Sequence, residues 1–478
     1  MEKPLLFSDA PLAPPPSSSG SRPENRRSGS SRPFPRPEIL LVILVGLALL
    51  TAPYHTATGG QFPLAGTSTP QQQTPTNLLA QADQVLKEMS QLTGLPIKAP
   101  LKKEIINREG VRKYLVENLH REMSPEELHA QQATLRAFGL VTRDFNLEEF
   151  LINFYTEQAA GFYDPVRKTM FIADWVPPDM QRLALAHELT HALQDQNYDL
   201  EKFLHAVKSD DDAVNARQAL VEGYATAAMM EALLKPMSLA SFPALEPIMS
   251  QVIDKQFQEF PAFSSAPFFF RFQALFPYIQ GMSFMQRGLQ LGGWKRLNQL
   301  FSNPPDATRE IFTPNVYFQK EPLPEVSLPR PSALENLHGL HFVAGNIMGE
   351  LGYYALLGQL LSEDEAKRLS NNWMADRYLV YEDSNQNYTL VGRTRWARPD
   401  IASSFFDDYH TILTHKYFDL AADKQSTPDL FVGSTSAGKV ILLHAGDECL
   451  WAEGIPNAQG RALLDWLRSL VPQAVAAN

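Results

Sequence analysis

The sequence predicts a mainly helical α+β protein with a small β-hairpin or sheet, and three observations lead to this prediction. The 478 residues are 44% hydrophobic and 20% charged, which is enough apolar material for a large folded core. Helix-start signals and helical spacing of apolar side chains dominate from residue 77 onward. Short β-rich runs are few, and the clearest two flank a turn-forming segment.

The N-terminal region differs in composition from the rest of the chain. Residues 1–37 are rich in proline and serine and carry a net charge of +3 (six basic and three acidic side chains), which leaves −14 for the remainder of a chain whose total is −11. We expect this stretch to be disordered. An apolar run, Ile39–Ala52, occupies most of residues 38–53, and residues 54–76 resemble a linker.

The apolar run is short for a membrane span and has the length of a signal segment. Arginines precede it, which predicts a cytoplasmic N-terminus. A small-x-small cleavage site is not clear, because Pro53 follows Ala52. We therefore favour an uncleaved signal anchor in the cell membrane, with one pass and the remaining chain outside the cytoplasm. The alternatives are a cleaved signal peptide, which would give a secreted or periplasmic protein, and a buried core helix.

From residue 77 the elements follow in order, in four regions: a helical N-terminal subdomain (77–150), a core region (151–240), a helical region (241–330) and a mixed C-terminal subdomain (331–478). Ser124-Pro125-Glu126-Glu127 and Asn146 with Glu149 each begin a helix. The runs 159–163 and 169–173 form the predicted hairpin, and helices are expected at about 180–194 and from the cap 209–212 to 234. The aromatic helical segments at 260–301 are read as core. A proline-rich stretch at 322–331 suggests a boundary. Beyond it we expect helices at about 345–361, 401–415 and 459–470 and a strand at 439–444.

Charge and cysteine content exclude several classes of function. The chain has 42 Lys and Arg against 53 Asp and Glu, so nucleic acid is not the expected main partner. A single cysteine, Cys449, excludes an internal disulfide framework and any zinc site built from cysteines. The sequence does not indicate an oligomeric state.

The strongest chemical signal is the segment Ala186-His187-Glu188-Leu189-Thr190-His191. Residues four apart lie on one face of a helix, so His187 and His191 can point their imidazoles at one metal ion such as Zn²⁺. Glu188 lies one step round the helix and can act on a water molecule as a general base. The alternative is a solvated face that carries two histidines, but the helix also presents an apolar face.

A catalytic zinc site needs three protein ligands and an open position. Glu222 lies 31 residues after His191 among small and apolar neighbours, where an unpaired carboxylate is costly and a cation would offset that cost. Gly223 in mid-helix suggests close packing of a neighbouring helix. Glu222 could instead lie on the surface of an alanine-rich helix. His205 and the cluster Asp210–Asp212 are competing ligands, although that cluster better explains a helix cap.

Further residues are candidates for supporting roles. Strand 169–173 could pair with an extended substrate, or it could be an ordinary edge strand. Gln194 or Asp195 could accept the free N–H of a ligand histidine, or either could lie on a solvated face. Candidates for stabilising a developing oxyanion, by residue type alone, are His338, His341, Arg377, Tyr378 and Tyr317, although residues of these types are more often structural.

His187-Glu188-x-x-His191 with Glu222 downstream resembles the gluzincin, or thermolysin-like, zinc metallopeptidases. The chain is still more similar to uncharacterised bacterial and archaeal gluzincin-like proteins in which a hairpin precedes the motif HELTHALQDQ and a Val-Glu-Gly-x-Ala-Thr helix follows. The segments that carry this likeness are 161–165, 186–196 and 221–226, with further matches at 292–294, 304–305 and 376–378, so it extends over most of residues 78–410.

The resemblance implies a zincin-like core in residues 151–240. It assigns His187, His191 and Glu222 to Zn²⁺ and Glu188 to catalysis. Two positions depart from the pattern: Thr313 stands where the closer relatives have a histidine, and Thr226 stands where thermolysin-like enzymes place an acidic residue that orients a histidine. If that histidine helps to bind substrate or the oxyanion in the relatives, Thr313 puts this role in doubt here. In place of Thr226, another group must orient the histidine.

The sequence thus predicts a zinc metallopeptidase, attached to the membrane, that hydrolyses peptide bonds of a peptide or protein substrate outside the cytoplasm. One alternative is an inactive or structural-zinc binding or scaffold protein of the cell envelope. Another is a metal-dependent hydrolase of a non-peptide bond. Whether the protein cleaves within a substrate chain, as an endopeptidase, or at its ends, as an exopeptidase, does not follow from the sequence.

Overall fold

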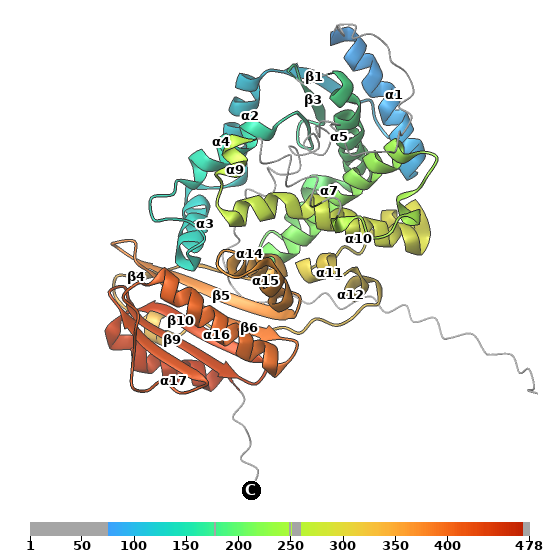
Figure 1. Ribbon diagram of the computed structural model, residues 1–478. Helices are drawn as coiled ribbons and strands as arrows, with labels where there is room; N and C mark the ends of the chain where they lie inside the picture. Colours follow the sequence, from blue (N-terminus) through green and yellow to red (C-terminus); the bar gives the residue numbers. More distant parts are fainter. Residues whose placement is uncertain (1–74, 176–177, 248–249, 251–259, 472–478) are drawn as a thin grey trace, which may run out of the picture. The chain divides into compact units, whose positions relative to one another are not determined.

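The computed structural model describes residues 75–175, 178–247, 250 and 260–471 (Figure 1). The predicted disordered terminus, the apolar run 39–52 and the linker up to residue 74 lie outside these residues. Among the described residues, no helix combines the length and the apolar character needed to cross a bilayer. The mixed α+β class is confirmed, but its β component is larger than the sequence analysis predicts.

The first helices begin at the predicted capping residues. Ser124 accepts a hydrogen bond from the backbone N–H of Glu127, whose side chain accepts one in return from the backbone N–H of Ser124. Asn146 caps the next helix by accepting from the N–H of Glu149. Both predicted helix starts are therefore confirmed. The helices of this region are α1 (Pro75–Thr93), α2 (Arg108–Glu122), α3 (Pro125–Phe138) and α4 (Leu147–Gln158).

A three-stranded sheet follows, with strand order β1-β3-β2. The predicted hairpin is confirmed as β2 (Gly161–Asp164) paired antiparallel with β3 (Thr169–Ala173). A strand that the sequence analysis missed, β1 (Lys102–Ile106), pairs parallel with the other edge of β3. β3 is therefore the central strand, and both its backbone edges are occupied. The expectations that β3 is an edge strand, or that it pairs with substrate, are wrong.

The core helices are α5 (Pro178–Tyr198), α6 (Leu200–His205) and α7 (Asp211–Leu234). Asp210 caps α7 by accepting from the N–H of Ala213, as the sequence predicts. The next elements are η3 (Leu239–Ser241), α9 (Pro261–Ser264), α10 (Phe268–Leu300), α11 (Thr308–Phe312) and α12 (Pro314–Phe318).

Helix α10 lies against α7 (Figure 1). The contact is closest at Gly223 and Gly281, where a Cβ added to Gly223 would stand 2.3 Å from a backbone carbon of Gly281. Gly223 thus permits the close helix packing that its position in mid-helix predicts. Several aromatic residues of α10, such as Phe276 and Phe284, are buried in the core as expected, and others, such as Phe272, are partly buried against it.

The C-terminal part contains a seven-stranded antiparallel sheet of order β4-β5-β6-β10-β9-β8-β7. Its strands are β4 (Leu340–Asn346), β5 (Trp373–Asp383), β6 (Tyr388–Trp396), β7 (Ala421–Ala422), β8 (Leu430–Thr435), β9 (Gly438–Ala445) and β10 (Glu448–Ile455). The helices of this part are α13 (Ser332–Glu335), α14 (Gly349–Leu357), α15 (Glu363–Ser370), α16 (Pro399–Lys416) and α17 (Gly460–Leu470), with η4 (Asn457–Gln459) before the last.

Helices cover both faces of this sheet. Trp451 contacts Phe405 and Tyr409 of α16, while its neighbour Leu450 belongs to the cluster that contains Leu463 of α17. Because successive side chains of a strand point to opposite faces, α16 and α17 lie on opposite sides. The strand predicted at 439–444 is confirmed as β9, but the Trp- and Tyr-rich stretch around 371–396 contains two strands that the sequence analysis did not assign.

Candidate metal centre

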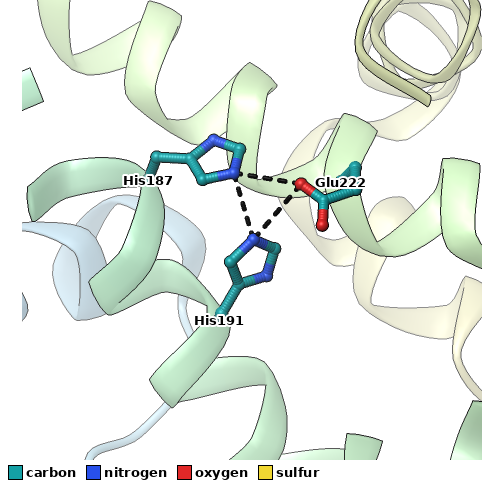
Figure 2. Close-up of side chains that lie close together, drawn as sticks. All are labelled: His187, His191 and Glu222. Atoms are coloured by element: carbon teal, nitrogen blue, oxygen red, sulfur yellow. Dashed lines mark hydrogen bonds and ion pairs between the residues drawn. The ribbon is translucent and has the colours of Figure 1, made fainter. Parts of the chain in front are cut away.

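Two neighbouring helices bring together the three predicted ligands. His187 and His191 lie one turn apart on α5, and Glu222 lies in the middle of α7. The Nε2 atom of His187 is 3.1 Å from Oε2 of Glu222 and 3.0 Å from Nε2 of His191, and Nε2 of His191 is 3.4 Å from the same carboxylate oxygen. Figure 2 shows both ring nitrogens and this oxygen pointing at one another. They form a group that could hold a metal ion.

All three side chains are at most 1% exposed. The alternatives of a solvated histidine face and of a surface glutamate are therefore wrong. The reason is that α5 packs against the hairpin, α1 and α7, which bury its middle turns on every side. A buried polar group of this kind requires partners, and here the partners are one another.

The distances suit a divalent cation. Ligand atoms bonded at about 2.0–2.2 Å to one tetrahedral ion stand roughly 3.3–3.6 Å apart, close to the observed spacing. Burial raises the pKa of Glu222, but the interactions with His191 and His187 outweigh it and hold that pKa well below its usual value. Burial lowers the pKa of His187. A carboxylate and a neutral imidazole are the protonation states that metal ligands need.

The competing third ligands lie elsewhere. His205 contacts Glu122, with 3.1 Å between Nε2 and the carboxylate oxygen. Asp210 caps α7, and Asp212 accepts hydrogen bonds from the backbone N–H and the hydroxyl of Thr308. Among the described residues, only Glu222 joins the two histidines within ligand distance.

Gln194 ties the two ligand helices together. Its Oε1 lies 2.8 Å from Nδ1 of His191, and its Nε2 donates to the carbonyl of Val221, next to Glu222 in the chain. Because Oε1 can only accept, Nδ1 of His191 carries the proton and Nε2 presents its lone pair to the metal position. Of the two residues considered for this contact, it is Gln194 that makes it.

Asp195 contacts the hairpin instead. It accepts from the hydroxyl of Tyr163 at 2.6 Å and from the ammonium of Lys168 at 2.8 Å. The backbone N–H of the same Tyr163 donates to Oε2 of Glu188 at 3.1 Å. Tyr163 therefore connects Asp195 to the predicted general base and fixes one carboxylate oxygen of that base.

Glu188 lies beside the metal group and is 3% exposed. Burial, followed by the nearby charge of Glu222, raises its pKa well above the ordinary value, and the Tyr163 N–H partly offsets this. Glu188 is not one of the three grouped ligands.

The Nδ1 atoms of the two histidines differ in their surroundings: Nδ1 of His191 contacts Gln194, and Nδ1 of His187 does not have such a contact. Within the described part of the chain, Nδ1 of His187 is buried without a hydrogen-bond partner, and so is the hydroxyl of Thr226. Thr226 therefore does not take over the orienting role. The ring of Tyr278, from α10, lies 6.0 Å from the His187 ring and is fully buried. The sequence did not single out Tyr278, since nothing distinguishes it within an aromatic helix.

The residues considered for oxyanion stabilisation lie on other elements. His341 is in β4 and Tyr378 in β5, where they pair with Glu382 and with Asn346 and Gly392, respectively. Tyr317 of α12 donates a hydrogen bond to the carbonyl of Asn303. Arg377 lies in β5, His338 lies just before β4, and Thr313 lies between α11 and α12.

Comparison with known proteins gives one match. Residues 340–464 match a protein family described as a domain of unknown function, DUF8575. The matched segment runs from β4 into α17 and contains none of the metal group. Neither the curated proteins nor the solved structures include a match to the chain. The likeness to gluzincins therefore stays a prediction that rests on the motif and on the geometry of α5 and α7.

Proposed function

We propose that the protein is a zinc-dependent metallopeptidase that hydrolyses peptide bonds. One observation carries the proposal: three ligand atoms from His187, His191 and Glu222 converge within 3.4 Å, with Glu188 next to them. The group offers three protein ligands, which leaves a fourth position of a tetrahedral ion open. A zinc ion held there would make water nucleophilic near neutral pH and polarise a substrate carbonyl.

Glu188 has the role of general base and acid. Its raised pKa favours acceptance of a proton from the attacking water and its later transfer to the leaving amine. The Tyr163 N–H holds one carboxylate oxygen, so the other is free to face the reacting atoms. Gln194 keeps His191 in the tautomer that binds metal.

Exchange of Glu188 for Gln tests this assignment. We expect Glu188→Gln to lower the rate at which a mixed peptide library is hydrolysed by at least about 100-fold, because proton transfer is lost. Zinc content, measured by atomic absorption, should stay near one ion per chain, because Glu188 is not a ligand. If the variant loses its zinc, Glu188 has been given the wrong role. If it keeps wild-type activity, the proposal is wrong.

A structural zinc site is the second candidate, and the burial of the group favours it, since structural sites are closed to solvent. Chelation distinguishes the two functions. Removal of a catalytic zinc should abolish peptide hydrolysis, which returns when zinc is added back. With a structural zinc, the chelated protein would lose stability, and the zinc-loaded protein would show no hydrolysis to lose.

We further propose that the catalytic part acts outside the cytoplasm, anchored by the apolar run 39–52 or exported through it. The arginines before this run support the orientation. Protease treatment of intact cells tests it: an externally placed α5–α7 region is digested, whereas a cytoplasmic one is protected.

A further inference from the structure

A second concave site shares no residue with the metal group. Its charged lining residues are basic, although the chain as a whole is acidic. A cavity of about 640 Å³, called here the α3–α16 cavity, is lined by Arg136 of α3, Arg143 of the following loop, Leu356 of α14, Tyr388 of β6 and Lys416 of α16, among others. Its volume is within the range of small-molecule pockets. The described lining residues include no Asp or Glu, although the chain holds 53 of them and has a net charge of −11.

Two of the three cations have no carboxylate partner among the described residues. Arg136 donates to the carbonyl of Phe145, and Arg143 donates to the side-chain oxygen of Asn387, both neutral acceptors. Asp144 and Asp383 interact electrostatically with these arginines without forming an ion pair. Lys416 differs, because Glu453 pairs with it at 2.5 Å. The positive charge of the cavity thus comes from Arg136 and Arg143.

Two residues that line the cavity each hold a buried polar atom without a hydrogen-bond partner in the described structure, namely Nε of Arg136 and the hydroxyl oxygen of Tyr388. Both can donate a hydrogen bond, and Nε of arginine can only donate. Buried polar atoms in folded proteins almost always have a partner, so a missing partner requires an explanation. A ligand that brings acceptor oxygens and negative charge would supply it.

We propose that the α3–α16 cavity binds a small ligand through an oxyanion group, such as a phosphate or a carboxylate. Guanidinium groups recognise both of these planar or tetrahedral oxyanions through paired N–H donors. The cavity has no residue in common with the metal group, so this proposal is independent of the proposed peptidase function.

Titration of the full-length protein with inorganic phosphate, and separately with citrate, tests the proposal. NaCl at equal ionic strength serves as the blank, and heat of binding is the measurement. We expect saturable binding that Arg136→Gln and Arg143→Gln each weaken by about 10-fold or more, since each removes a charged hydrogen bond. Tyr388→Phe removes only the hydroxyl and should weaken binding by about 3- to 10-fold. Because that hydroxyl has no partner within the described part of the chain, Tyr388→Phe should leave the melting temperature without ligand unchanged.

Arg112→Gln is the matched control. Like Arg143, Arg112 is exposed and donates to an asparagine side chain, that of Asn153. Unlike Arg143, it lies on α2 outside the cavity. Its exchange should leave oxyanion binding unchanged. If the cavity variants bind as tightly as Arg112→Gln does, the oxyanion binds elsewhere, for example at the metal group, and the proposal is overturned.

The oxyanion could belong to a free solute or to a lipid headgroup. Phe418, two residues after Lys416, is 94% exposed, as expected of a side chain that enters a bilayer surface. Flotation with phosphatidylglycerol vesicles, compared with phosphatidylcholine vesicles, separates the sources. If Phe418→Ser and Arg143→Gln reduce vesicle binding and free phosphate does not bind, the ligand is a headgroup. If neither probe responds to the cavity variants, the cavity does not bind oxyanions.

Discussion

Two of the buried carboxylates of helix α7, Asp212 and Glu222, lie in regions that differ in how the charge is compensated. At its first turn, Asp212 accepts from the backbone and hydroxyl of Thr308. Close by, Glu350 pairs with Arg309 at 3.3 Å. In the middle of the same helix, Glu222 contacts only two imidazoles among the described residues.

Asp376 extends the first region, called here the carboxylate junction (Asp212, Glu350 and Asp376). It accepts from the backbone N–H groups of Met348 and Gly349 at the start of α14 and from the ring N–H of Trp373. Each of the three carboxylates thus has fixed donors. The donors to Asp212 and Asp376 are neutral, and Glu350 has the cation Arg309. Glu222 instead contacts two imidazoles, which can themselves bind a metal ion. The difference indicates that the junction is structural, whereas the middle of α7 is arranged for a cation that comes from solution.

The largest expected effect comes from exchanging one carboxylate from each region. Glu222→Gln should lower zinc affinity by at least about 1,000-fold, because it removes one of three ligands. Asp212→Asn should leave zinc affinity unchanged and lower the free energy of unfolding by about 1–3 kcal/mol, because Thr308 loses a charged acceptor. Competition with a coloured chelator and urea unfolding measure the two quantities. Equal loss of zinc in both variants would mean that the two regions do not differ as described.

The packing that positions Glu222 can be broken next to it. Gly223→Val would place side-chain carbons within 2.3 Å of the Gly281 backbone, so α7 and α10 must separate. We expect a loss of about 3 kcal/mol in the free energy of unfolding, or failure to fold. Ala225→Val, on the same helix, provides a comparison with an equally buried position. If Gly223→Val melts at the wild-type temperature, the close contact of the two helices is incorrect.

A smaller effect is expected from Gln194, which connects the metal helices. Gln194→Ala should weaken zinc binding by about 10- to 100-fold, because His191 loses the acceptor that fixes its tautomer. Gln196→Ala is the matched control, since Gln196 binds the backbone of Lys98 and Ala99 instead. If both variants bind zinc equally tightly, Gln194 does not help to position His191 for the metal.

These contrasts also show what the sequence could predict. The ligands His187 and His191 follow from a helical spacing of four, and Glu222 follows from a carboxylate among apolar neighbours; both signals are local. Gln194 and Asp195 are adjacent in the chain, and only the orientation of their side chains decides which contacts His191. Sequence reasoning therefore left both open.

The strands and side-chain clusters that the sequence did not predict depend on contacts between distant segments. β1 contains Lys102, Lys103 and Glu104 and pairs with β3, so its strand conformation comes from a partner far along the chain. Strands such as β10 are buried on both faces and lack the alternation that would reveal them. The carboxylate junction brings together residues 212, 308, 350 and 376, and no sequence spacing connects them.

The smallest expected effect concerns the pH dependence of stability at the junction. Burial raises the pKa of Glu350 to about 8, although Arg309 opposes the shift. Between pH 6 and pH 7 the folded protein keeps this proton, while the unfolded chain, with an ordinary pKa near 4.3, has lost it. The folded state then binds more protons, so stability falls as pH rises, by about 1 kcal/mol over this single pH unit.

Glu350→Gln removes this contribution and keeps an acceptor for Arg309. Urea unfolding at pH 6 and pH 7 should therefore show a smaller loss of stability in Glu350→Gln than in the wild type, by about 1 kcal/mol. Exchange of the half-buried Glu365 for Gln controls for a general change in charge, because the hydrogen bond from Arg368 lowers the pKa of that side chain instead of raising it. The same pH dependence in all three proteins would mean that Glu350 is ionised when folded, with Arg309 as its full counter-charge. Glu350 would then be a charge paired with a fixed cation, the Arg309 side chain. Glu222 would differ in that its proposed cation is a metal ion, which can exchange with solution.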